Sequence, residues 1–523
     1  MTPPADRTAV VLWLSTCVLL LGISASAVAA AWLNHDAGWY LHMAGAWLDG
    51  AVLYRDVIDT NPPLIVYLTV IPVLLGRMLH LPGPATFKTL IFIAALATVT
   101  GAASILRRLH PSDLGRLLVV SALLFLVLPF VRADYGQREH IVALLVTPYA
   151  LASAAWAAGR PIGRKGDVAL GALAGLGFAM KPHFLLAWAG AELCILLATE
   201  PQRRIWLRPA ALGVAASLLL YGLIASVHVP QYFTVASEVA RVYGGLNVQP
   251  ATLLRLPELR VWLLALVMLA FVRLPATQWR ACLVILVLAT GFLLAALLQL
   301  KGWAYHLYPF RVFAGLYFAM VAAAILASHG AATELVRGGQ RTVAAAVAGA
   351  LILIAVRYMP ETSAPAGVEH VRALHALVER ERAESIAVLS MRTILFPAFP
   401  VVNYTGATWV MRHHSLWFLP GLYARELSTA TGDVPYGAVS AMDPLERQYF
   451  EQVVGDLCAQ PPRVLVVEPP LPADRPGPRS IDLLAYYGQD ERFARLFRPF
   501  EPRETFGQFT AYVRRVEASC LPR

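Results

Sequence analysis

The sequence predicts an all-α polytopic membrane protein with a small α/β soluble domain at its C-terminal end. Three observations support this fold class. First, 58% of the 523 residues are hydrophobic and only 15% are charged, whereas about a quarter of a typical soluble domain is charged. Second, apolar runs of about 20 residues, long enough to cross a bilayer as a helix, recur along the chain. Third, the composition beyond residue 358 becomes that of a soluble domain.

The basic residues argue for a membrane orientation rather than for nucleic-acid binding. The formal net charge is +10, but the Lys and Arg side chains stand in short clusters between apolar runs. Such clusters are typical of the cytoplasmic loops of membrane proteins. We therefore exclude nucleic acid as a partner.

Residues 62–79 decide the predicted topology. This apolar run is short, begins with two prolines and contains Pro72. If it lies along the outer surface instead of spanning, all the short basic linkers fall on one side of the membrane, as orientation bias requires. We predict the surface position. The small residues from Ser24 to Ala30 resemble a signal-peptidase site, but the apolar run is long and only Arg7 precedes it, so we favour an uncleaved first span.

With this choice the sequence predicts about 11 transmembrane helices. The N-terminus is then cytoplasmic, and the C-terminal domain is periplasmic. The predicted domains are a transmembrane domain over 1–357, with a periplasmic first loop at 32–83, and a soluble α/β domain over 358–523. The spans are expected near 9–31, 84–106, 116–131, 140–158, 167–181, 184–199, 209–227, 257–273, 281–299, 310–328 and 342–357.

The soluble domain has about 160 residues, enough for a core of its own. Its periodicity predicts helices over 371–383 and 443–458 and short strands over 385–390 and 463–468. Cys458 and Cys520 are its only cysteines. Because the periplasm is oxidising, we predict that they form a disulfide.

The first loop carries the leading candidate for catalysis. It is rich in carboxylates and aromatic residues, and Asp36 is the candidate catalytic base. The alternative is that Asp36 only caps the helix that begins near Ala37, because helix starts favour Asp. Asp56 and Asp59 are expected to form turns around Asn61-Pro62 rather than to act in catalysis.

Further polar clusters are predicted to reach the same membrane face. They are the stretch from Arg132 to His140, Lys181-Pro182-His183, the loop over residues 228–256 and the stretch from Lys301 to Arg311. A carboxylate base flanked by cations suits transfer from a phosphate leaving group, since the cations offset the charge that develops on the phosphate. The alternatives are a local ion pair for Glu139, snorkelling for the Lys and Arg side chains, and an interfacial aromatic belt around His306.

The order of these features resembles the GT-C superfamily of membrane glycosyltransferases. An acidic residue opens the first external loop, an amphipathic helix follows, and then comes Asn-Pro-Pro-Leu at Asn61–Leu64. The pattern is most similar to the protein O-mannosyltransferases and lipid A aminoarabinose transferases of the family 39 type. It covers residues 9–200, and the remainder is similar only in architecture. The chain departs from the pattern at Ala37, where many relatives have Glu, and at Asn61, where they have Lys.

This resemblance implies a donor sugar linked to polyprenyl phosphate and matches Asp36 and Glu139 to the two acidic sites of the superfamily. We expect an inverting glycosyltransferase of the bacterial inner membrane that acts on a lipid, glycan or protein acceptor. The alternatives are a transporter or lipid flippase and a non-catalytic scaffold. The expected roles are base for Asp36; assistance or acceptor orientation for Glu139 and His140; donor-phosphate binding for Lys181, Lys301, His306 and Arg311; and substrate contact for Trp39, Tyr40, Arg138 and Trp303. No cofactor is implied with certainty, and a divalent metal stays open.

Overall fold

The structure is a computed structural model that describes residues 7–110, 112–198, 207–328, 347, 349–353, 365–430, 434–470 and 479–521. The chain divides into two compact units. The bundle unit comprises 1–31, 87–226 and 248–361, and the sheet unit comprises 32–86, 227–247 and 362–523. The first loop and residues 227–247 therefore group with the C-terminal residues, a division that the predicted domains did not include.

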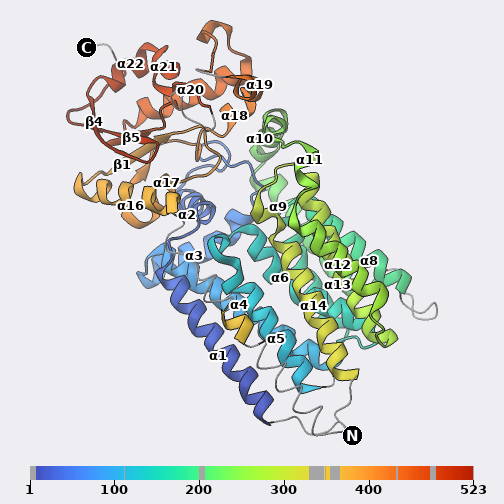
Figure 1. Cartoon of the computed structure of the whole chain (residues 1–523). Helices are drawn as coiled ribbons and strands as arrows, with labels where there is room; N and C mark the ends of the chain where they lie inside the picture. Colours follow the sequence, from blue (N-terminus) through green and yellow to red (C-terminus); the bar gives the residue numbers. More distant parts are fainter. Residues whose placement is uncertain are drawn as a thin grey trace. The chain divides into compact units, whose positions relative to one another are not determined.

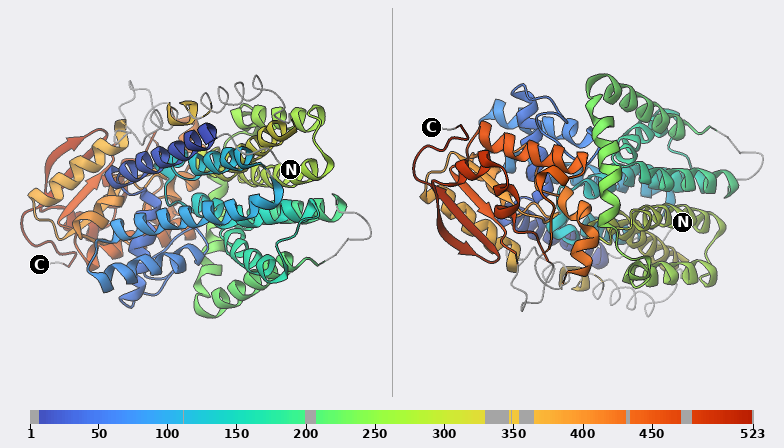
Figure 2. Two further views of the ribbon diagram at one scale, coloured as in Figure 1. Left: turned by 90° about the horizontal axis from the view of Figure 1, so that it is seen from below. Right: turned by 90° about the horizontal axis from the view of Figure 1, so that it is seen from above.

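The bundle unit consists of apolar helices that run alongside one another (Figures 1 and 2). Short 3₁₀ turns join several of them. Its elements are α1 (Arg7–Ala30), α4 (Gly83–Leu109), α5 (Asp113–Val127), η1 (Pro129–Asp134), α6 (Arg138–Ala157), α7 (Arg164–Ala179), η2 (Pro182–Phe184), α8 (Leu185–Ala198), α9 (Pro209–His228), α11 (Pro250–Leu253), α12 (Pro257–Phe271), α13 (Ala276–Leu298), η5 (Ala304–Leu307) and α14 (Tyr308–Ser328).

The length and composition of these helices make the chain a multi-pass membrane protein. Within the described residues, seven helices are long and apolar enough to cross a membrane, and two shorter apolar helices accompany them. Large apolar side chains face outward, with Leu219 76% and Phe271 80% exposed. Such exposure is unusual for a soluble monomer and ordinary for a surface that meets lipid.

Seven of the predicted spans coincide with helices in the described residues that are long and apolar enough to cross a membrane. Helices α7 and α12 occupy two of the predicted spans but have only 16 and 15 residues, short of the roughly 20 needed to cross the hydrocarbon core. Helix α8, with 14 residues, is also short. The eleventh predicted span, 342–357, lies largely outside the described residues.

Helix α6 forms the centre of the bundle unit, since nearly all of its residues are buried. It packs against α7, α13 and α14. Small residues let other helices approach closely. A Cβ atom on Gly171 of α7 would collide with the carbonyl of Ala210 in α9, and one on Gly213 of α9 would collide with the carbonyl of Val168 in α7. Close approach at small residues is typical of helix packing in membranes.

The sheet unit combines a five-stranded sheet with short helices. Its elements are α2 (His35–Leu48), α3 (Leu64–Leu79), α10 (Gln231–Tyr243), η4 (Gly244–Leu246), α16 (Pro365–Arg380), β1 (Ser385–Leu389), α17 (Ala398–Thr405), β2 (Thr408–Trp409), α18 (Phe418–Leu422), α19 (Ala424–Thr429), η6 (Val439–Ala441), α20 (Pro444–Ala459), β3 (Val464–Val467), α21 (Leu483–Gly488), α22 (Glu491–Phe497), β4 (Phe500–Phe506) and β5 (Phe509–Arg514).

The strand order is β2-β1-β3-β5-β4. Strands β2, β1 and β3 are parallel, with Ile386 of β1 opposite Val464 of β3. Strand β5 runs antiparallel to both of its neighbours, β3 and β4. All four residues of β3 are buried. This explains its continuous apolar sequence, because a parallel strand covered on both faces has no polar face. The small α/β domain predicted at the C-terminal end is confirmed.

Four predicted elements of this domain are present. The two predicted strands are β1 and β3, and the two predicted helices are α16 and α20. Asp443 caps α20, since its carboxylate accepts a hydrogen bond from the backbone N–H of Leu445. The β4–β5 hairpin was not predicted. It turns at Gly507, whose φ of 57° is a left-handed conformation that favours glycine.

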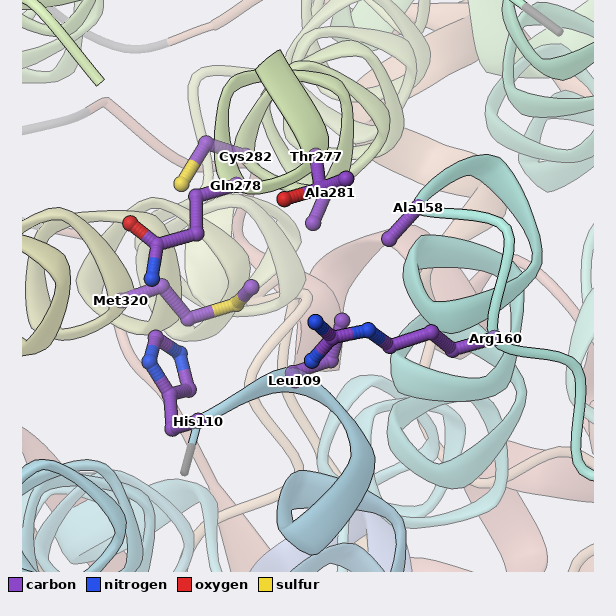
Figure 3. A pocket seen from close by; sticks show the side chains of 9 residues that line it. All are labelled: Leu109, His110, Ala158, Arg160, Thr277, Gln278, Ala281, Cys282 and Met320. Atoms are coloured by element: carbon purple, nitrogen blue, oxygen red, sulfur yellow. The ribbon is translucent and has the colours of Figure 1, made fainter. Parts of the chain in front are cut away.

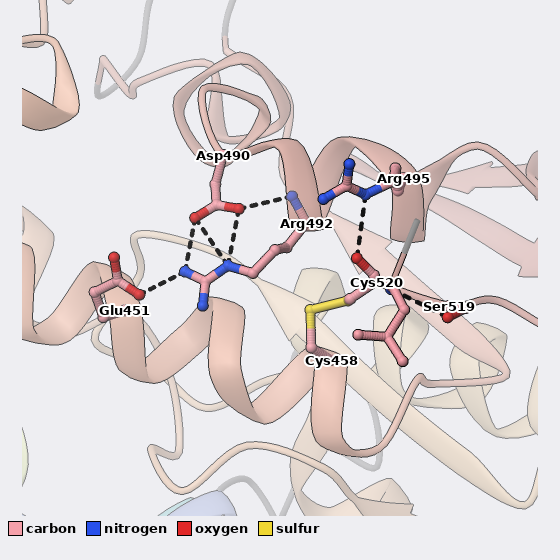
Figure 4. Close-up of a disulfide and its surroundings, with 8 residues drawn as sticks. Glu451, Cys458, Asp490, Arg492, Arg495, Ser519 and Cys520 are labelled. Atoms are coloured by element: carbon pink, nitrogen blue, oxygen red, sulfur yellow. Dashed lines mark hydrogen bonds and ion pairs between the residues drawn. A yellow bond between two sulfur atoms is a disulfide. The ribbon is translucent and has the colours of Figure 1, made fainter. Parts of the chain in front are cut away.

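Cys458 and Cys520 form the predicted disulfide (Figure 4). Their Cα atoms are 5.6 Å apart, within the range that a disulfide can bridge. The bond ties the last turn of α20 to the C-terminal tail across 62 residues. Arg495 supports the tail, because its Nε donates a hydrogen bond to the carbonyl of Cys520 at 3.1 Å. The prediction of this pairing is confirmed.

Candidate functional site

The first group of candidate residues lies at one end of the bundle unit. Arg138 and Glu139 are in the first turn of α6, Lys181 precedes η2, and Gln299 follows α13. The Lys181 ammonium donates a hydrogen bond to Glu139 Oε1 at 2.6 Å and another to Gln299 Oε1 at 3.2 Å. Three separate helical hairpins thus contribute to one polar cluster.

The Glu139–Lys181 pair is almost completely removed from solvent. The two side chains are 0% and 8% exposed. Removing both charges from water costs several kcal/mol per ion. A buried pair of this kind therefore does not by itself indicate that it stabilises the fold, and it suggests a functional role. The second carboxylate oxygen, Oε2 of Glu139, has no hydrogen-bond partner in the described residues. This oxygen is a ready acceptor for a hydroxyl group.

His306 brings further cations into the same cluster. It lies in η5 and is 4% exposed. Lys181, Arg138 and Lys301 are all close enough to act on its imidazole electrostatically. The structure therefore brings together Arg138, Glu139, Lys181, Lys301 and His306, although they come from three distant parts of the sequence.

Aromatic rings border this cluster. The rings of Trp303 and Tyr305 stack with centroids 5.9 Å apart, and the Tyr305 ring meets His306 edge-on at 4.4 Å. The Lys181 ammonium lies 5.5 Å from the Tyr305 ring centroid. Half-buried aromatic faces next to cations provide apolar surface for a ring or a chain beside a charged group.

Lys301 is the cation of this cluster whose charge responds to pH near neutrality. It lies in the connection between α13 and η5, and its side chain is buried. Burial lowers the pKa of the Lys301 ammonium from its usual 10.5 to about 8, since removal from water disfavours the charged form. Lys301 is mainly charged at neutral pH and loses that charge as the pH rises through about 8.

His140 is occupied by backbone groups. Gly136 N–H donates to His140 Nδ1 at 3.1 Å, so Nε2 carries the proton and donates to the carbonyl of Val127 at 2.8 Å. Both ring nitrogens therefore hold the connection before α6. In this connection Arg132 has a φ of 54° and a ψ of −127°, an unfavourable conformation that persists only where its surroundings impose it. This geometry favours a positioning role for His140 over direct contact with an acceptor.

Arg311 is engaged outside the cluster. Its guanidinium donates from Nε and Nη2 to Glu258 Oε1 at 2.8 Å and 2.6 Å. Glu258 lies in the first turn of α12 and its side chain is 7% exposed. The predicted contact of Arg311 with a donor phosphate has no geometric support within the bundle unit and stays a prediction.

Asp36 lies in the sheet unit, in the first turn of α2. The side chain of Asn34 caps this helix, because its Oδ1 accepts hydrogen bonds from the backbone N–H of Asp36 at 2.9 Å and of Ala37 at 3.4 Å. The alternative that Asp36 is the helix cap is therefore wrong. Its carboxylate is 16% exposed and lies 2.9 Å from the Nδ1 atom of His35.

The position of Asp36 is fixed by the packing of α2 on α17. Asn403 of α17 donates a hydrogen bond to the carbonyl of Gly38 at 2.9 Å. A Cβ atom on Gly38 would lie 2.6 Å from Asn403 Oδ1, so a larger residue there would force the Asn403 side chain to shift. Trp39 is 0% exposed, and its ring packs against that of Phe399 at 5.2 Å.

The burial of Trp39 and Tyr40 favours a packing role. Tyr40 is 1% exposed, and substrate contact by these two residues stays a prediction. The interpretation of Asp56 and Asp59 as turn formers agrees with their contacts. Val52 N–H donates to Asp56 Oδ2 at 2.8 Å, and Asn61 N–H donates to Asp59 Oδ1 at 2.6 Å.

Sequence reasoning missed three side chains of the bundle unit. Gln299 holds Lys181, Tyr305 lies under it, and Glu258 pairs with Arg311. Glu258 had a usable signal, since it is an acidic residue directly after a proline at the start of an apolar run. Gln299 had none, because a single amide at the end of a span is ordinary. Tyr305 lies in the stretch from Lys301 to Arg311 that was predicted to reach the same membrane face, but no site role was predicted for it.

No group of three or more His, Cys, Asp and Glu side chains could hold a metal ion in the part of the chain that the structure describes. The described side chains around Glu139 are mostly cationic, and cations repel a metal ion. These residues therefore do not fit a metal site.

A small cavity lies at the other end of α6 and α13 (Figure 3). Its volume is ≈ 10 Å³, enough for about one water molecule. Burial and the charge of Arg116 lower the pKa of His110 to about 4, so this histidine is neutral. The cavity is too small for a sugar or a phosphate. It is lined by Leu109, His110, Ala158, Arg160, Thr277, Gln278, Ala281, Cys282 and Met320.

No protein-family model matches the sequence, and no curated protein matches it. The fold is similar to that of ArnT from Cupriavidus metallidurans in a crystal structure with bound undecaprenyl phosphate. The TM-score is 0.49 and the identity 13%, over 97% of this chain and 98% of that one.

The fold is also similar to that of the Archaeoglobus fulgidus oligosaccharyltransferase, crystallised with a tethered acceptor peptide. The TM-score is 0.46 and the identity 13%, over 87% of this chain and 68% of that one. Both proteins are GT-C membrane glycosyltransferases. At 13% identity the likeness concerns the fold alone and transfers no residue roles.

Proposed function

We propose that the protein is an inverting glycosyltransferase that moves a sugar from a polyprenyl-phosphate donor to a lipid, glycan or protein acceptor. One observation carries the proposal: the buried cluster of Glu139, Lys181, Lys301 and His306 at the end of a membrane-embedded helix bundle. Charged groups buried in a membrane protein are expensive and usually functional. Cations beside aromatic surface suit a phosphate attached to an apolar chain.

Lys181, Lys301 and His306 stabilise the leaving phosphate in this mechanism. The bond between the anomeric carbon and the phosphate oxygen breaks, and negative charge grows on that oxygen. Donors fixed in a water-poor site stabilise such charge strongly because they need no reorganisation. Glu139 Oε1 keeps Lys181 oriented, and the unpartnered Oε2 accepts a hydrogen bond from a substrate hydroxyl.

Asp36 acts as the general base. The acceptor hydroxyl attacks the anomeric carbon from the face opposite the phosphate, and its proton passes to the Asp36 carboxylate. The products are an inverted glycoside and polyprenyl phosphate. Because Asn34 already caps α2, the carboxylate of Asp36 is not needed to start the helix. This is the physical basis for assigning it a chemical role.

The direct test uses membranes that contain the protein and a labelled polyprenyl-phosphate sugar. We expect transfer of the label with release of polyprenyl phosphate, and we expect Lys181→Met to reduce binding of undecaprenyl phosphate. Movement of the intact donor across the bilayer without release of the lipid phosphate would contradict the proposal and favour a flippase.

The proposal also includes orientation, with the N-terminus in the cytoplasm of a bacterial cell and the sheet unit in the periplasm. Arg77 and Ala133 are exposed, so cysteines placed there report on accessibility better than one at the buried Arg138. In a background without Cys17, Cys194 and Cys282, both should react with an impermeant thiol reagent added outside. A cysteine at Arg160 should react only after permeabilisation, and labelling of Arg160 from outside would refute this orientation.

A further inference from the structure

The parallel strands of the sheet unit end at an edge whose topology is typical of ligand-binding sheets. The chain runs from β1 to β2 on one side of β1 and later returns to β3 on its other side. The strand order therefore reverses between β1 and β3. In open sheets with parallel strands, ligands bind outside the carboxyl ends of the strands at this kind of switch point.

Three polar side chains meet at this switch point. Ser390 directly follows β1, and Glu468 directly follows β3. Ser390 Oγ donates a hydrogen bond to Glu468 Oε2 at 2.5 Å, and Arg392 Nε donates one to Glu468 Oε1 at 2.7 Å. The backbone N–H of Arg392 donates to Ser390 Oγ at 3.1 Å. The three residues thus form a closed hydrogen-bonded group.

Burial differs sharply within this group. Ser390 and Glu468 are 4% and 8% exposed, while the side chain of Arg392 is 40% exposed. In the described part of the chain, Arg392 uses only its backbone N–H and Nε as donors, and neither of its Nη amino groups bonds to a protein atom. A buried carboxylate therefore fixes the guanidinium from behind and leaves its two terminal amino groups open.

We propose that this group is a binding site for an oxyanion, either a phosphate or a carboxylate. The planar guanidinium presents two parallel N–H donors that match the two oxygens of such a group. Its orientation by Glu468 lowers the entropy that binding would otherwise cost. The site lies entirely within the sheet unit, so it does not depend on the proposed transfer chemistry.

A purely structural role, in which Ser390 and Glu468 only tie β1 to β3, predicts a different result. It requires no ligand at the open side of Arg392. The exposed Arg380 provides a matched reference in the same unit. It is also held by one carboxylate, with Nη2 donating to Glu504 at 2.7 Å, and its side chain is 48% exposed. It lies in the last turn of α16, not after a parallel strand.

The experiment measures the rate at which phenylglyoxal modifies each arginine of the full-length protein, read by peptide mass spectrometry. At constant ionic strength, inorganic phosphate or acetate should slow modification of Arg392 several-fold and leave Arg380 unchanged. Because the readout is the modified peptide, phosphate bound near Lys181 does not affect it. Equal rates for Arg392 with and without the anions would overturn the proposal for soluble ligands.

Two further arms complete the test. Protein in phosphatidylglycerol nanodiscs, compared with phosphatidylcholine nanodiscs, shows whether a lipid headgroup supplies the oxyanion. Protection in these discs alone assigns the site to lipid, and protection in none of the arms rejects it. Glu468→Leu keeps Arg392 but removes its support, so protection should fall to the level of Arg380. Full protection in this variant would refute the orienting role of Glu468.

Discussion

An ion pair of the bundle unit and one of the sheet unit differ sharply in burial. In the bundle unit, Glu139 and Lys181 are 0% and 8% exposed and form one short ion pair. In the sheet unit, Arg77 and Asp49 form a pair at 2.8 Å, close to the 2.6 Å of the buried pair, but they are 46% and 65% exposed. The two pairs have similar distances, but the difference in burial changes what each contributes to stability.

This difference in burial indicates which charged residues are candidates for function. An exposed pair contributes about 0–1 kcal/mol and forms wherever long side chains meet. A buried pair must overcome a desolvation penalty that apolar residues of the same volume would not incur. The exposed pair needs no functional explanation, whereas the buried one does. The predictions below test this contrast, beginning with the largest expected effect.

Asp36→Asn should abolish most sugar transfer. Asn keeps the shape of Asp but does not accept the proton of the acceptor, and loss of a general base typically lowers a rate by about a hundredfold to ten-thousandfold. Because Asn34 caps α2, the variant should fold and insert normally. Turnover of a labelled lipid donor measures the effect. Asp49→Asn at the C-terminal end of the same helix is the control and should stay active, while near-normal transfer by Asp36→Asn would move the base assignment to Glu139.

Glu139→Ala should destabilise the bundle unit by about 3–5 kcal/mol, since it leaves the buried Lys181 without its carboxylate. The double variant Glu139→Gln with Lys181→Met should recover most of this stability but remain inactive. Unfolding in mixed detergent micelles measures stability, and lipid-donor turnover measures activity. Arg77→Gln, which breaks the exposed pair with Asp49, should change stability by less than about 1 kcal/mol. A loss for Arg77→Gln as large as for Glu139→Ala would remove the contrast between the units.

Replacing both Cys458 and Cys520 by Ser should destabilise the sheet unit by about 2–4 kcal/mol, the typical contribution of a disulfide. The bond closes a long stretch, since its two cysteines are 62 positions apart in the sequence. Limited proteolysis across a temperature series follows this unit separately, while sugar transfer should persist at low temperatures at which the sheet unit stays folded. Identical proteolysis midpoints for the variant and the native chain would show that the link contributes nothing.

Raising the pH through about 8 should weaken binding of the lipid donor by up to about tenfold per pH unit. The pKa of Lys301 is lowered to about 8 by burial, so its positive charge is present below that pH and lost above it. Folding stability should change in the opposite direction. The unfolded chain holds this proton up to its usual pKa of 10.5, so the contribution of Lys301 to stability rises between about pH 8 and 10.5.

Binding of undecaprenyl phosphate across this pH range measures the effect. Lys301→Arg should remove the pH dependence, because Arg stays charged throughout. A profile for Lys301→Arg that still falls near pH 8 would assign the titration to another group.

Much of the fold was predictable because its signals are local. The length of an apolar run sets whether a helix spans the membrane, and seven predicted spans coincide with long apolar helices in the described residues. The strands β1 and β3 were visible as short β-branched runs. Two other predicted spans coincide with shorter helices, of 16 and 15 residues. Residues 167–181 and 257–273 are apolar, but the length of a helix depends on where its caps fall.

The candidate site was predictable only as a set of residue types. The sequence pointed to Glu139, Lys181, Lys301 and His306 because each is a polar residue at the end of an apolar run. It gave no information on which of these residues meet. His140 and Arg311 had the same local signal, yet backbone groups hold the first and Glu258 holds the second.

The sequence alone determined the membrane class, the soluble C-terminal domain and the pool of charged residues at the ends of spans, since composition and periodicity act over a few helical turns. Only the tertiary structure decided that Lys181 bonds to Glu139 and Gln299, which are 42 and 118 residues away in the chain. It also decided that Asn34, and not Asp36, caps α2. Both outcomes depend on side chains brought together by packing and backbone geometry, and residue type does not specify such distances.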